Sequence, residues 1–448
     1  MTQERLPQSM VVAYAVPQMG LAWFQMFFTN YFLKYSVDVL LIAPLIISAI
    51  LSLTRLWDAV SDPAVGYLSD RTTSAAGRRR PWLLGSALPV AFVTYAMWNP
   101  PLGLEGAMLV LWMAVAVTLW ETAMTGFYVP YMALGAEVSM GHHDRTRVAG
   151  YRHVFGGLGN LSVIGCVYLI THSTEQRATA QTLFLVGGAA AAASMLLGIW
   201  RVREHPEHRR LGARRFMSSV LGSIRNPHLR RLIAIYFFDI AGVAAVGLLG
   251  PFVAEYVVGQ PGLIPQLMLV FSFASYLSTP FTVFLSRRIG KSRVWISVLA
   301  LQIAGFVSAF FAGTGDAAYL LGCIFLIGLG STGGQVVGVS LLADAADFDE
   351  HRTGERREGF YYASINFARK FMFSALTMMV GFSMQFLIGF EPNAEQTPET
   401  LLGLKRLFSG IPAVAFLVAI ALLLRFGLTE AAHQRVRSEL DARKASEE

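Results

Sequence analysis

The sequence predicts an all-α membrane protein, and three observations lead to that class: the composition, the length of the apolar runs, and the charge of the loops between them. The chain has 448 residues, of which 54% are hydrophobic and only 15% are charged. A soluble protein carries charge at about a quarter of its positions, so this chain has too little polar surface to cover soluble domains. We therefore exclude a soluble enzyme, a disordered chain and a fibrous protein.

Twelve apolar runs are long enough to cross a hydrocarbon core of roughly 30 Å. The predicted transmembrane spans cover residues 11–35, 39–69, 82–100, 105–137, 149–171, 181–201, 229–257, 261–285, 294–312, 317–345, 359–391 and 406–428. The loops after spans 2, 4, 6, 8 and 10 are rich in arginine and lysine, and the loops between those carry almost none. Because Lys and Arg accumulate in cytoplasmic loops, we expect both termini in the cytoplasm. The net charge of +7 then reflects topology, and we expect no nucleic acid partner.

The basic loops also repeat at an interval of six spans. Asp70-Arg71 ends the second span and is followed by three arginines, while Arg287, Arg288 and Lys291 follow the eighth. The longest linker lies between the sixth and seventh spans. This pattern predicts two pseudo-symmetric six-helix bundles, the architecture of the major facilitator fold. The predicted parts are an N-terminal bundle (1–201), a cytoplasmic linker (202–228), a C-terminal bundle (229–428) and a cytoplasmic tail (429–448).

Two acidic residues in the second span predict a cation site. Asp58 and Asp62 are four residues apart, so they share one helix face, and Asp62 lies near the middle of the membrane. Two carboxylates there repel each other, and a hard cation such as Na⁺, which prefers oxygen ligands, or a proton would relieve the repulsion. Ser61 adds a hydroxyl. Arg55 could instead pair with Asp58, but one arginine cannot neutralise two aspartates.

Other spans carry polar residues at depths where they are costly in lipid. Glu121, Thr125 and Tyr128 share one face of the fourth span, although packing or bonding within their own helix is an equal alternative. Lys370 lies deep in the eleventh span, close to Asn366, and could pair with an aspartate of the other half. The two cysteines lie inside apolar runs and indicate neither a disulfide framework nor a metal site, so we expect no cofactor apart from the coupling ion.

Several of these motifs resemble the glycoside–pentoside–hexuronide:cation symporter family. The run from Arg55 to Pro63 resembles the signature of its second span, and Val129-Pro130-Tyr131 resembles its next motif. The acidic run from Ala343 to Asp349 and the eleventh-span Lys370 resemble its C-terminal half. The match extends from about Tyr14 to the last span. Motifs from both halves occur in the family's order, so the resemblance is specific.

The resemblance implies roles for particular residues. The cation site would use Asp58 and Asp62 with Ser61 and Thr125, Lys370 and Arg55 would couple it to the substrate, and Arg152 would lie near the substrate. The full set of implied substrate-binding residues is Arg152, Glu121, Tyr128, Asn366 and Lys370. In the resembling superfamily the cytoplasmic loops latch the cytoplasmic face, which implies gating by Asp70, Arg71, Asp344 and Asp347.

The substrate is the least determined feature of the sequence. Ala22, Tyr128 and Met132 stand where galactoside-binding members have two carboxylates and an indole, so an α-galactoside does not fit. The cationic side chains of Arg152 and Lys370 are retained, and they suit a carboxylated sugar, such as a hexuronide, through charge-assisted hydrogen bonds. The run from Glu121 to Tyr131 is also similar to the lysophosphatidylcholine symporters of the family, which makes an amphipathic anion the alternative.

These features predict a secondary active symporter, and not an enzyme, that imports a glycoside or hexuronide with Na⁺ or H⁺ by alternating access. The alternatives are a transporter of lysophospholipid and, with less support, a sensor that transports nothing. We expect a multi-pass plasma membrane protein, in a bacterium the inner membrane, that works as a monomer. Its partners would be a small-molecule substrate and the surrounding membrane lipids.

Overall fold

The structure, a computed structural model, describes residues 6–138, 142–202, 226–353, 358–426 and 434–439. Within these residues the chain forms helices and no strand. Twelve helical segments of the described part are long and apolar enough to cross a membrane, which confirms the predicted all-helical fold. The predicted linker (202–228) and tail (429–448) lie largely outside the described residues.

The helices fall into two compact units. The first contains the described residues before the linker together with Gly381–Gln385 and Glu391–Ala394, and the second contains the other described residues. The helices of the first unit are α1 (Gln8–Ala15), α2 (Pro17–Asn30), α3 (Phe32–Asp38), α4 (Pro44–Arg71), α5 (Arg80–Trp98), α6 (Gly106–Val138), α7 (His142–Thr171) and α8 (Gln176–Arg201). The helices after the linker are α10 (Pro227–Phe252), η2 (Val253–Val257), η3 (Pro261–Leu263), α11 (Ile264–Ile289), α12 (Lys291–Ala309), α13 (Ala317–Gly330), η4 (Gly333–Gly338), α14 (Val339–Thr353), α15 (Glu358–Phe382), η5 (Ser383–Leu387) and α16 (Pro398–Leu424).

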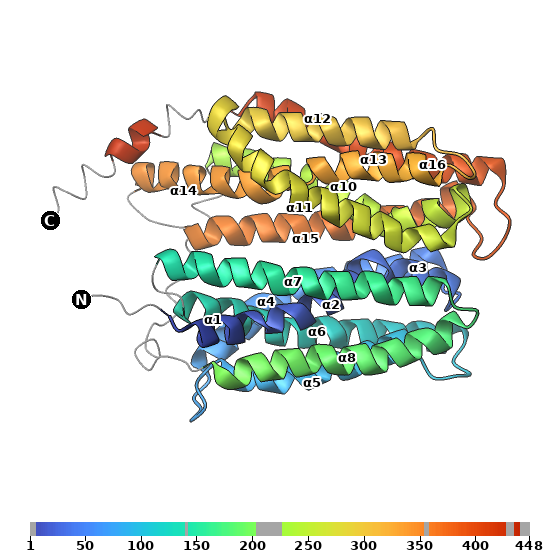
Figure 1. Cartoon of the computed structure of the whole chain (residues 1–448), viewed down its shortest axis with the longest axis horizontal. Coiled ribbons are helices and arrows are strands. Elements are labelled where there is room, and N and C mark those ends of the chain that lie inside the picture. The colour runs from blue at the N-terminus through green and yellow to red at the C-terminus, as the bar shows by residue number, and fades with distance from the viewer. Residues whose placement is uncertain (1–5, 139–141, 203–225, 354–357, 427–433, 440–448) are drawn as a thin grey trace. The chain divides into compact units, whose positions relative to one another are not determined.

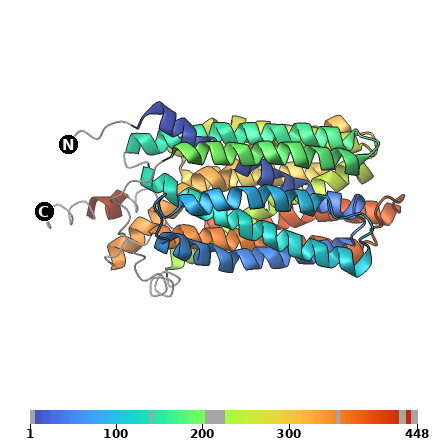
Figure 2. The ribbon, with the colours of Figure 1, turned by 90° about the horizontal axis from the view of Figure 1, so that it is seen from below.

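Glycines let the helices of the first unit approach closely. α2 packs on α7 and α8, and α7 and α8 contact each other as the two green helices of Figure 2. Gly159 of α7 lies against the backbone of α2 at Met19, where a methyl group would overlap the carbonyl oxygen. Small residues at such contacts strengthen van der Waals packing between helices in lipid. α4 packs on α6, and α5 packs on both α6 and α8, so α4 and α6 form the contact that carries the predicted cation residues.

In the second unit, α10 packs on α16, α12 packs on α13 and α16, and α11 packs on α13 (Figure 1). The tenth span is interrupted between α13 and α14 by the π-helix η4. π-helical turns within α-helices are rare and are found mainly at functional positions. The tenth span also continues to Thr353, so Asp344 and Asp347 lie on a helix rather than in the loop that follows it.

The last span begins earlier than the hydropathy predicts. α16 starts at Pro398, whereas the predicted span starts at residue 406. Thr397 caps the helix, because its side-chain oxygen accepts a hydrogen bond from the Thr400 backbone N–H at 3.2 Å, and proline is well suited to the first helical position. Lys405, which the predicted boundary leaves in the loop, therefore lies on α16, and Arg406 lies more than two turns inside this helix.

Candidate cation and substrate site

A carboxylate pair and one hydroxyl meet where α4 packs on α6. The Thr125 Oγ1 atom lies 2.6 Å from Asp58 Oδ1 and 3.1 Å from Asp62 Oδ1. Asp58 and Thr125 are buried, and Asp62 is half-buried. The spacing of four residues places both carboxylates on the α4 face that contacts α6, as the sequence predicts, and Thr125 joins them from the neighbouring helix.

The Thr125 hydroxyl cannot form hydrogen bonds with both carboxylates as a donor. A threonine hydroxyl has a single hydrogen, so Thr125 can donate to only one of the two carboxylates. The 2.6 Å distance to Asp58 fits a charge-assisted hydrogen bond. The contact with Asp62 then brings two oxygen atoms together with no hydrogen between them, unless Asp62 is protonated or a cation lies among the oxygens. Either a proton or a hard monovalent cation suits this set of oxygen atoms.

A third acid and an arginine complete the charge of the cluster. The Arg55 Nη1 atom lies 3.2 Å from Glu121 Oε1, and its guanidinium lies 5.1 Å from the centre of the Phe28 ring. Glu121 is one helical turn before Thr125, so the ion pair lies next to the carboxylate pair. This part of the first unit thus holds three carboxylates (Asp58, Asp62 and Glu121) and one guanidinium (Arg55).

The backbone near the carboxylates offers further oxygen atoms. Pro63 lies inside α4 and has no N–H, so it cannot donate to the carbonyl of Ala59, four residues earlier. Ser61 is buried, and its hydroxyl donates to the carbonyl of Asp58 at 3.4 Å. On the other side of α4, the Trp57 Nε1–H donates to Thr122 Oγ1 at 3.0 Å, which fixes the register of α4 against α6.

Arg152 forms a second polar centre of the first unit, between α2, α6 and α7. Its Nε and Nη2 atoms donate to Gln18 Oε1 at 3.2 and 2.8 Å, and Nη2 also approaches the Met132 sulfur at 3.0 Å. Its guanidinium lies 5.1 Å from the centre of the Tyr131 ring. Among the described residues no carboxylate pairs with Arg152. Its neighbours orient the guanidinium without neutralising it.

Tyrosines of α1 and α6 pack beside this centre. The Tyr14 and Tyr131 rings stack with 4.7 Å between their centres, and each hydroxyl donates to the other's backbone carbonyl at 2.8 Å. Tyr128 and Met132 of α6 stay partly exposed. Asn366 and Lys370 lie on α15 of the second unit, where Asn366 is exposed and Lys370 is half-buried, so their substrate and coupling roles stay predictions.

The four predicted gating residues all contact a neighbouring side chain. Asp70 and Arg71 end α4, where Asp70 lies 2.8 Å from Arg79 across the loop between α4 and α5, and Arg71 lies over the Tyr67 ring at 4.3 Å. In the second unit Asp344 and Asp347 lie within α14. The Lys291 ammonium, at the start of α12, contacts both oxygens of Asp344, at 2.8 and 2.6 Å, and Asp347 pairs with Arg437 at 3.2 Å.

Gln18 and Asp239 are candidate site residues that the sequence did not place. Asp239 of α10 accepts a hydrogen bond from Trp295 Nε1 at 3.0 Å, and its other oxygen lies against Gly334 in η4, where a methyl group would overlap it. An acid in the middle of the seventh span is a signal that could have found this position. Gln18 gave no such signal, because its role comes only from its contact with Arg152.

The second unit also holds an uncharged counterpart of the carboxylate cluster. Ser278-Thr279-Pro280 of α11 repeats Ser61-Asp62-Pro63 of α4, and each proline is followed eight residues later by an arginine. The Thr332 hydroxyl forms hydrogen bonds with the hydroxyls of Ser278, at 3.2 Å, and Thr282, at 2.9 Å. Hydroxyls stand here where the first unit has carboxylates.

Comparison with known proteins identifies the family. The family described as MFS/sugar transport protein matches residues 13–430, so the chain belongs to that family of major facilitator transporters. Uncharacterized symporter YjmB of Bacillus subtilis (strain 168) is 24% identical over 453 residues, which cover 98% of this chain and 96% of that protein. Putative glycoside/cation symporter YagG of Escherichia coli (strain K12) is 23% identical over 439 residues, with coverage of 96% and 93%.

A eukaryotic relative and solved structures agree with this assignment. Sodium-dependent lysophosphatidylcholine symporter 1 of Xenopus tropicalis is 25% identical over 447 residues, covering 90% of this chain and 83% of that protein. The nucleoside transporter NupG has a TM-score of 0.66 at 12% identity, with 93% of this chain and 99% of NupG covered. A D-xylose-proton symporter has a TM-score of 0.65 at 12% identity, with 92% and 96% covered. These structures establish the fold.

The protein is therefore an integral, multi-pass membrane transporter and not an enzyme. The predicted resemblance and the major facilitator fold are both confirmed, and the bacterial symporter relatives support an inner-membrane location. Relatives that are symporters also support coupling to a cation and a small-molecule substrate.

If Thr125 supplies a cation ligand, its hydroxyl and not its shape should matter. We expect Thr125→Val to weaken Na⁺ binding roughly 10- to 150-fold, the equivalent of one hydrogen bond to a charged group, and Thr125→Ser to bind as the wild type does. The midpoint of Na⁺-dependent thermal stabilisation of the purified protein measures this. Thr118→Val, two turns away on the same helix, serves as the control, because the Thr118 hydroxyl bonds to the Ala114 carbonyl of its own helix. Equal Na⁺ dependence in Thr125→Val and the wild type would contradict the assignment.

Proposed function

We propose that the protein is a symporter that couples one Na⁺ or H⁺, bound at Asp58, Asp62 and Thr125, to the import of a small anionic solute. The observation that carries the proposal is the contact of one hydroxyl with two carboxylates between α4 and α6. Two carboxylates and a hydroxyl so placed form a set of oxygen ligands that suits a proton or a hard monovalent cation. Ser61 and the Ala59 carbonyl are the neighbouring oxygen donors.

Coupling follows from the charge of the cluster. Without the ion, the excess negative charge repels an anionic substrate and strains the contact between α4 and α6. With the ion, the first unit is closer to neutral, and the substrate binds beside it. Substrate must then tighten ion binding by the same factor as the ion tightens substrate binding. We propose that the bundles over 1–201 and 229–428 rock about this site in a monomer, with both termini in the cytoplasm.

Arg152 supports an anionic substrate. A guanidinium inside a transmembrane unit is costly without a negative partner, and the described residues give Arg152 only neutral ones. A carboxylate or phosphate of the substrate would neutralise the Arg152 guanidinium through charge-assisted hydrogen bonds. A hexuronide fits this centre, because the partly exposed Tyr128 could stack on a sugar ring, and a glycoside/cation symporter is among the relatives. Glu121, Asn366 and Lys370 are proposed as further substrate contacts.

A lysophospholipid is the second candidate substrate. Ala22 and Met132 make the neighbourhood of Arg152 apolar on one side, which suits an acyl chain beside a phosphate. A sodium-dependent lysophosphatidylcholine symporter is among the relatives. The hexuronide remains our first proposal because most of the family resemblance is to sugar carriers.

The transport proposal is tested by uptake into proteoliposomes. We expect Asp58→Asn and Asp62→Asn each to abolish uptake of labelled glucuronide driven by a Na⁺ or H⁺ gradient, because either change removes a carboxylate from the ion site. Glu105→Gln, which neutralises an exposed acid outside the spans, should transport normally. Wild-type uptake by either aspartate variant would reject the ion site, and binding of substrate without any flux in the wild type would favour a sensor.

Substitution of Arg152 should affect the binding of anionic and neutral substrates differently. We expect Arg152→Gln to raise the Kd for glucuronide roughly 10- to 150-fold, because one or two charge-assisted hydrogen bonds are lost, and to leave any weak binding of methyl glucoside unchanged. Arg152→Lys should recover only part of the affinity, since it keeps the charge but loses the planar fork. Titrations by thermal shift with Na⁺ measure these values. Equal losses for the charged and the neutral ligand would contradict the role, and stabilisation by lysophosphatidylcholine alone would favour the lipid substrate.

We also propose that the ion pairs Asp70–Arg79 and Lys291–Asp344 stabilise the outward-open state, with Arg71 and Asp347 as neighbours in the same latch. Asp70→Asn should bias the protein inward about five-fold, as expected for a part-buried ion pair worth about 1 kcal/mol. Arg79→Gln should do the same, and the double variant should add little. Labelling of Tyr128→Cys by an impermeant maleimide from outside, in a chain lacking its two native cysteines, reports the shift. Unchanged labelling in Asp70→Asn would count against the latch.

A further inference from the structure

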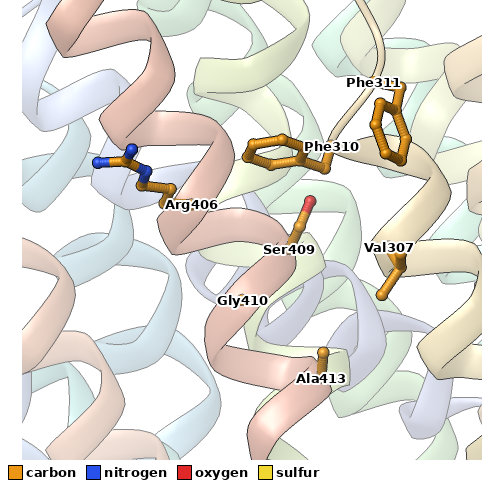
Figure 3. A pocket seen from close by; sticks show the side chains of 7 residues that line it. All are labelled: Val307, Phe310, Phe311, Arg406, Ser409, Gly410 and Ala413. Carbon is orange, nitrogen blue, oxygen red and sulfur yellow. The ribbon is translucent and has the colours of Figure 1, made fainter.

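A groove runs between the end of α12 and the beginning of α16, far along the chain from the carboxylate cluster (Figure 3). Phe310, Phe311 and Val307 form one wall, and Gly410 and Ala413 form the other. Its volume is about 210 Å³, below the roughly 300–1,000 Å³ of pockets that enclose small molecules. The groove can therefore hold part of an elongated ligand, but it is too small to enclose a soluble substrate.

The groove opens on an apolar surface. Phe311 is 69% exposed, and Val414 and Leu417, which follow on α16, are 63% and 57% exposed. Val414 and Leu417 lie on α16, which is long and apolar enough to cross a membrane, so we infer that this surface faces the hydrocarbon of the bilayer. The occupant that reaches the groove most directly is therefore a membrane lipid.

Ser409 places an unsatisfied hydroxyl at the base of the groove. Its side chain is only 4% exposed, and its oxygen has no hydrogen-bond partner among the described residues. Figure 3 shows this oxygen directed toward the space beside Phe310. Leaving a buried hydroxyl without a partner is unfavourable, so a ligand with an acceptor oxygen would stabilise this site.

Arg406 places an unpaired positive charge at the rim. It is exposed, and no described residue forms an ion pair or hydrogen bond with it. Its guanidinium points away from the two phenylalanines in Figure 3, so the charge lies outside the groove while the side-chain stem borders it. α12 begins beside the basic loop at Lys291 and ends at this groove, so Arg406 lies at the opposite, cation-poor end of the unit.

The depth of Arg406 matches that of a lipid headgroup. The segment 407–424 completes α16 after it, and its 18 residues span about 27 Å at 1.5 Å per residue, close to the thickness of the hydrocarbon core. Arg406 therefore lies at the boundary between hydrocarbon and headgroups. Along the same helix face, Ser409, Gly410 and Ala413 follow at steps of three, four and seven residues, which lead progressively deeper into the membrane.

We propose that this groove binds an anionic phospholipid from the surrounding leaflet. The phosphate contacts the Arg406 guanidinium, and the Ser409 hydroxyl, one turn deeper, donates to an ester carbonyl oxygen. One acyl chain lies against Gly410, Ala413 and Val307. The order of charge, hydroxyl and apolar wall along the helix face is the order of phosphate, ester and acyl chain in the lipid.

The test is the retention of phosphatidylglycerol by the purified full chain, measured by native mass spectrometry and by lipid-dependent thermal stabilisation. Arg406→Gln should lower retention about ten-fold or more. The matched control is Lys405→Gln, which removes the same charge from the adjacent residue and should leave retention unchanged. Gly410→Leu should also reduce retention, since a Cβ atom added at Gly410 meets no atom within 4 Å and the longer side chain would occupy the groove.

The outcomes are distinct. Loss of phosphatidylglycerol in both Arg406→Gln and Gly410→Leu, with Lys405→Gln unaffected and thermal stability without lipid preserved, supports the proposal. Equal retention by Arg406→Gln and the wild type, or an equal loss in Lys405→Gln, overturns it. Stabilisation of the wild type by inorganic phosphate alone, lost in Arg406→Gln, would assign the arginine to a soluble anion and also overturn the lipid site.

Discussion

Two carboxylates held within hydrogen-bonding distance of one hydroxyl, inside an apolar bundle, set the terms for the rest of the first unit. Two unit charges 4 Å apart repel by about 4 kcal/mol at an effective dielectric constant of 20. Thr125 has one hydrogen to share between the two carboxylates, and Arg55 pairs with Glu121 one turn away. In the proposed mechanism a bound ion or proton lowers the remaining repulsion where α4 packs against α6.

Sequence spacing was sufficient for the residues of this cluster that share a helix. A separation of four residues fixes Asp58 beside Asp62, and Glu121 beside Thr125, whatever the tertiary structure. The partner of Arg55 was beyond this reasoning, because a long guanidinium can reach either along its own helix or across to the next one. The contact between Gln18 and Arg152 was equally inaccessible, since it depends on how α2 packs against α7.

The predicted start of the last span is wrong because helix capping and hydropathy give different boundaries there. The first turns of α16 contain Glu399, Lys405 and Arg406, so an average of hydropathy excludes them, while Thr397 and Pro398 supply a strong start signal eight residues earlier. Helix propensity and capping do not depend on lipid exposure, and a helix can extend beyond the hydrocarbon at little cost. This extension places Arg406 more than two turns inside the helix, on one face with Ser409 and Ala413.

The two units differ in side-chain chemistry at the positions that correspond to the proposed ion site. The repeat places Ser275, Ser278 and Thr279 of the second unit where the first has Asp58, Ser61 and Asp62. Hydroxyls can each donate and accept, so Thr332 satisfies Ser278 and Thr282 without any added charge. Ionised carboxylates can only accept, so the corresponding face of α4 favours a proton or a cation. Exchange of hydroxyl for carboxylate at two corresponding positions thus distinguishes the hydroxyl contact of the second unit from the proposed ion site of the first.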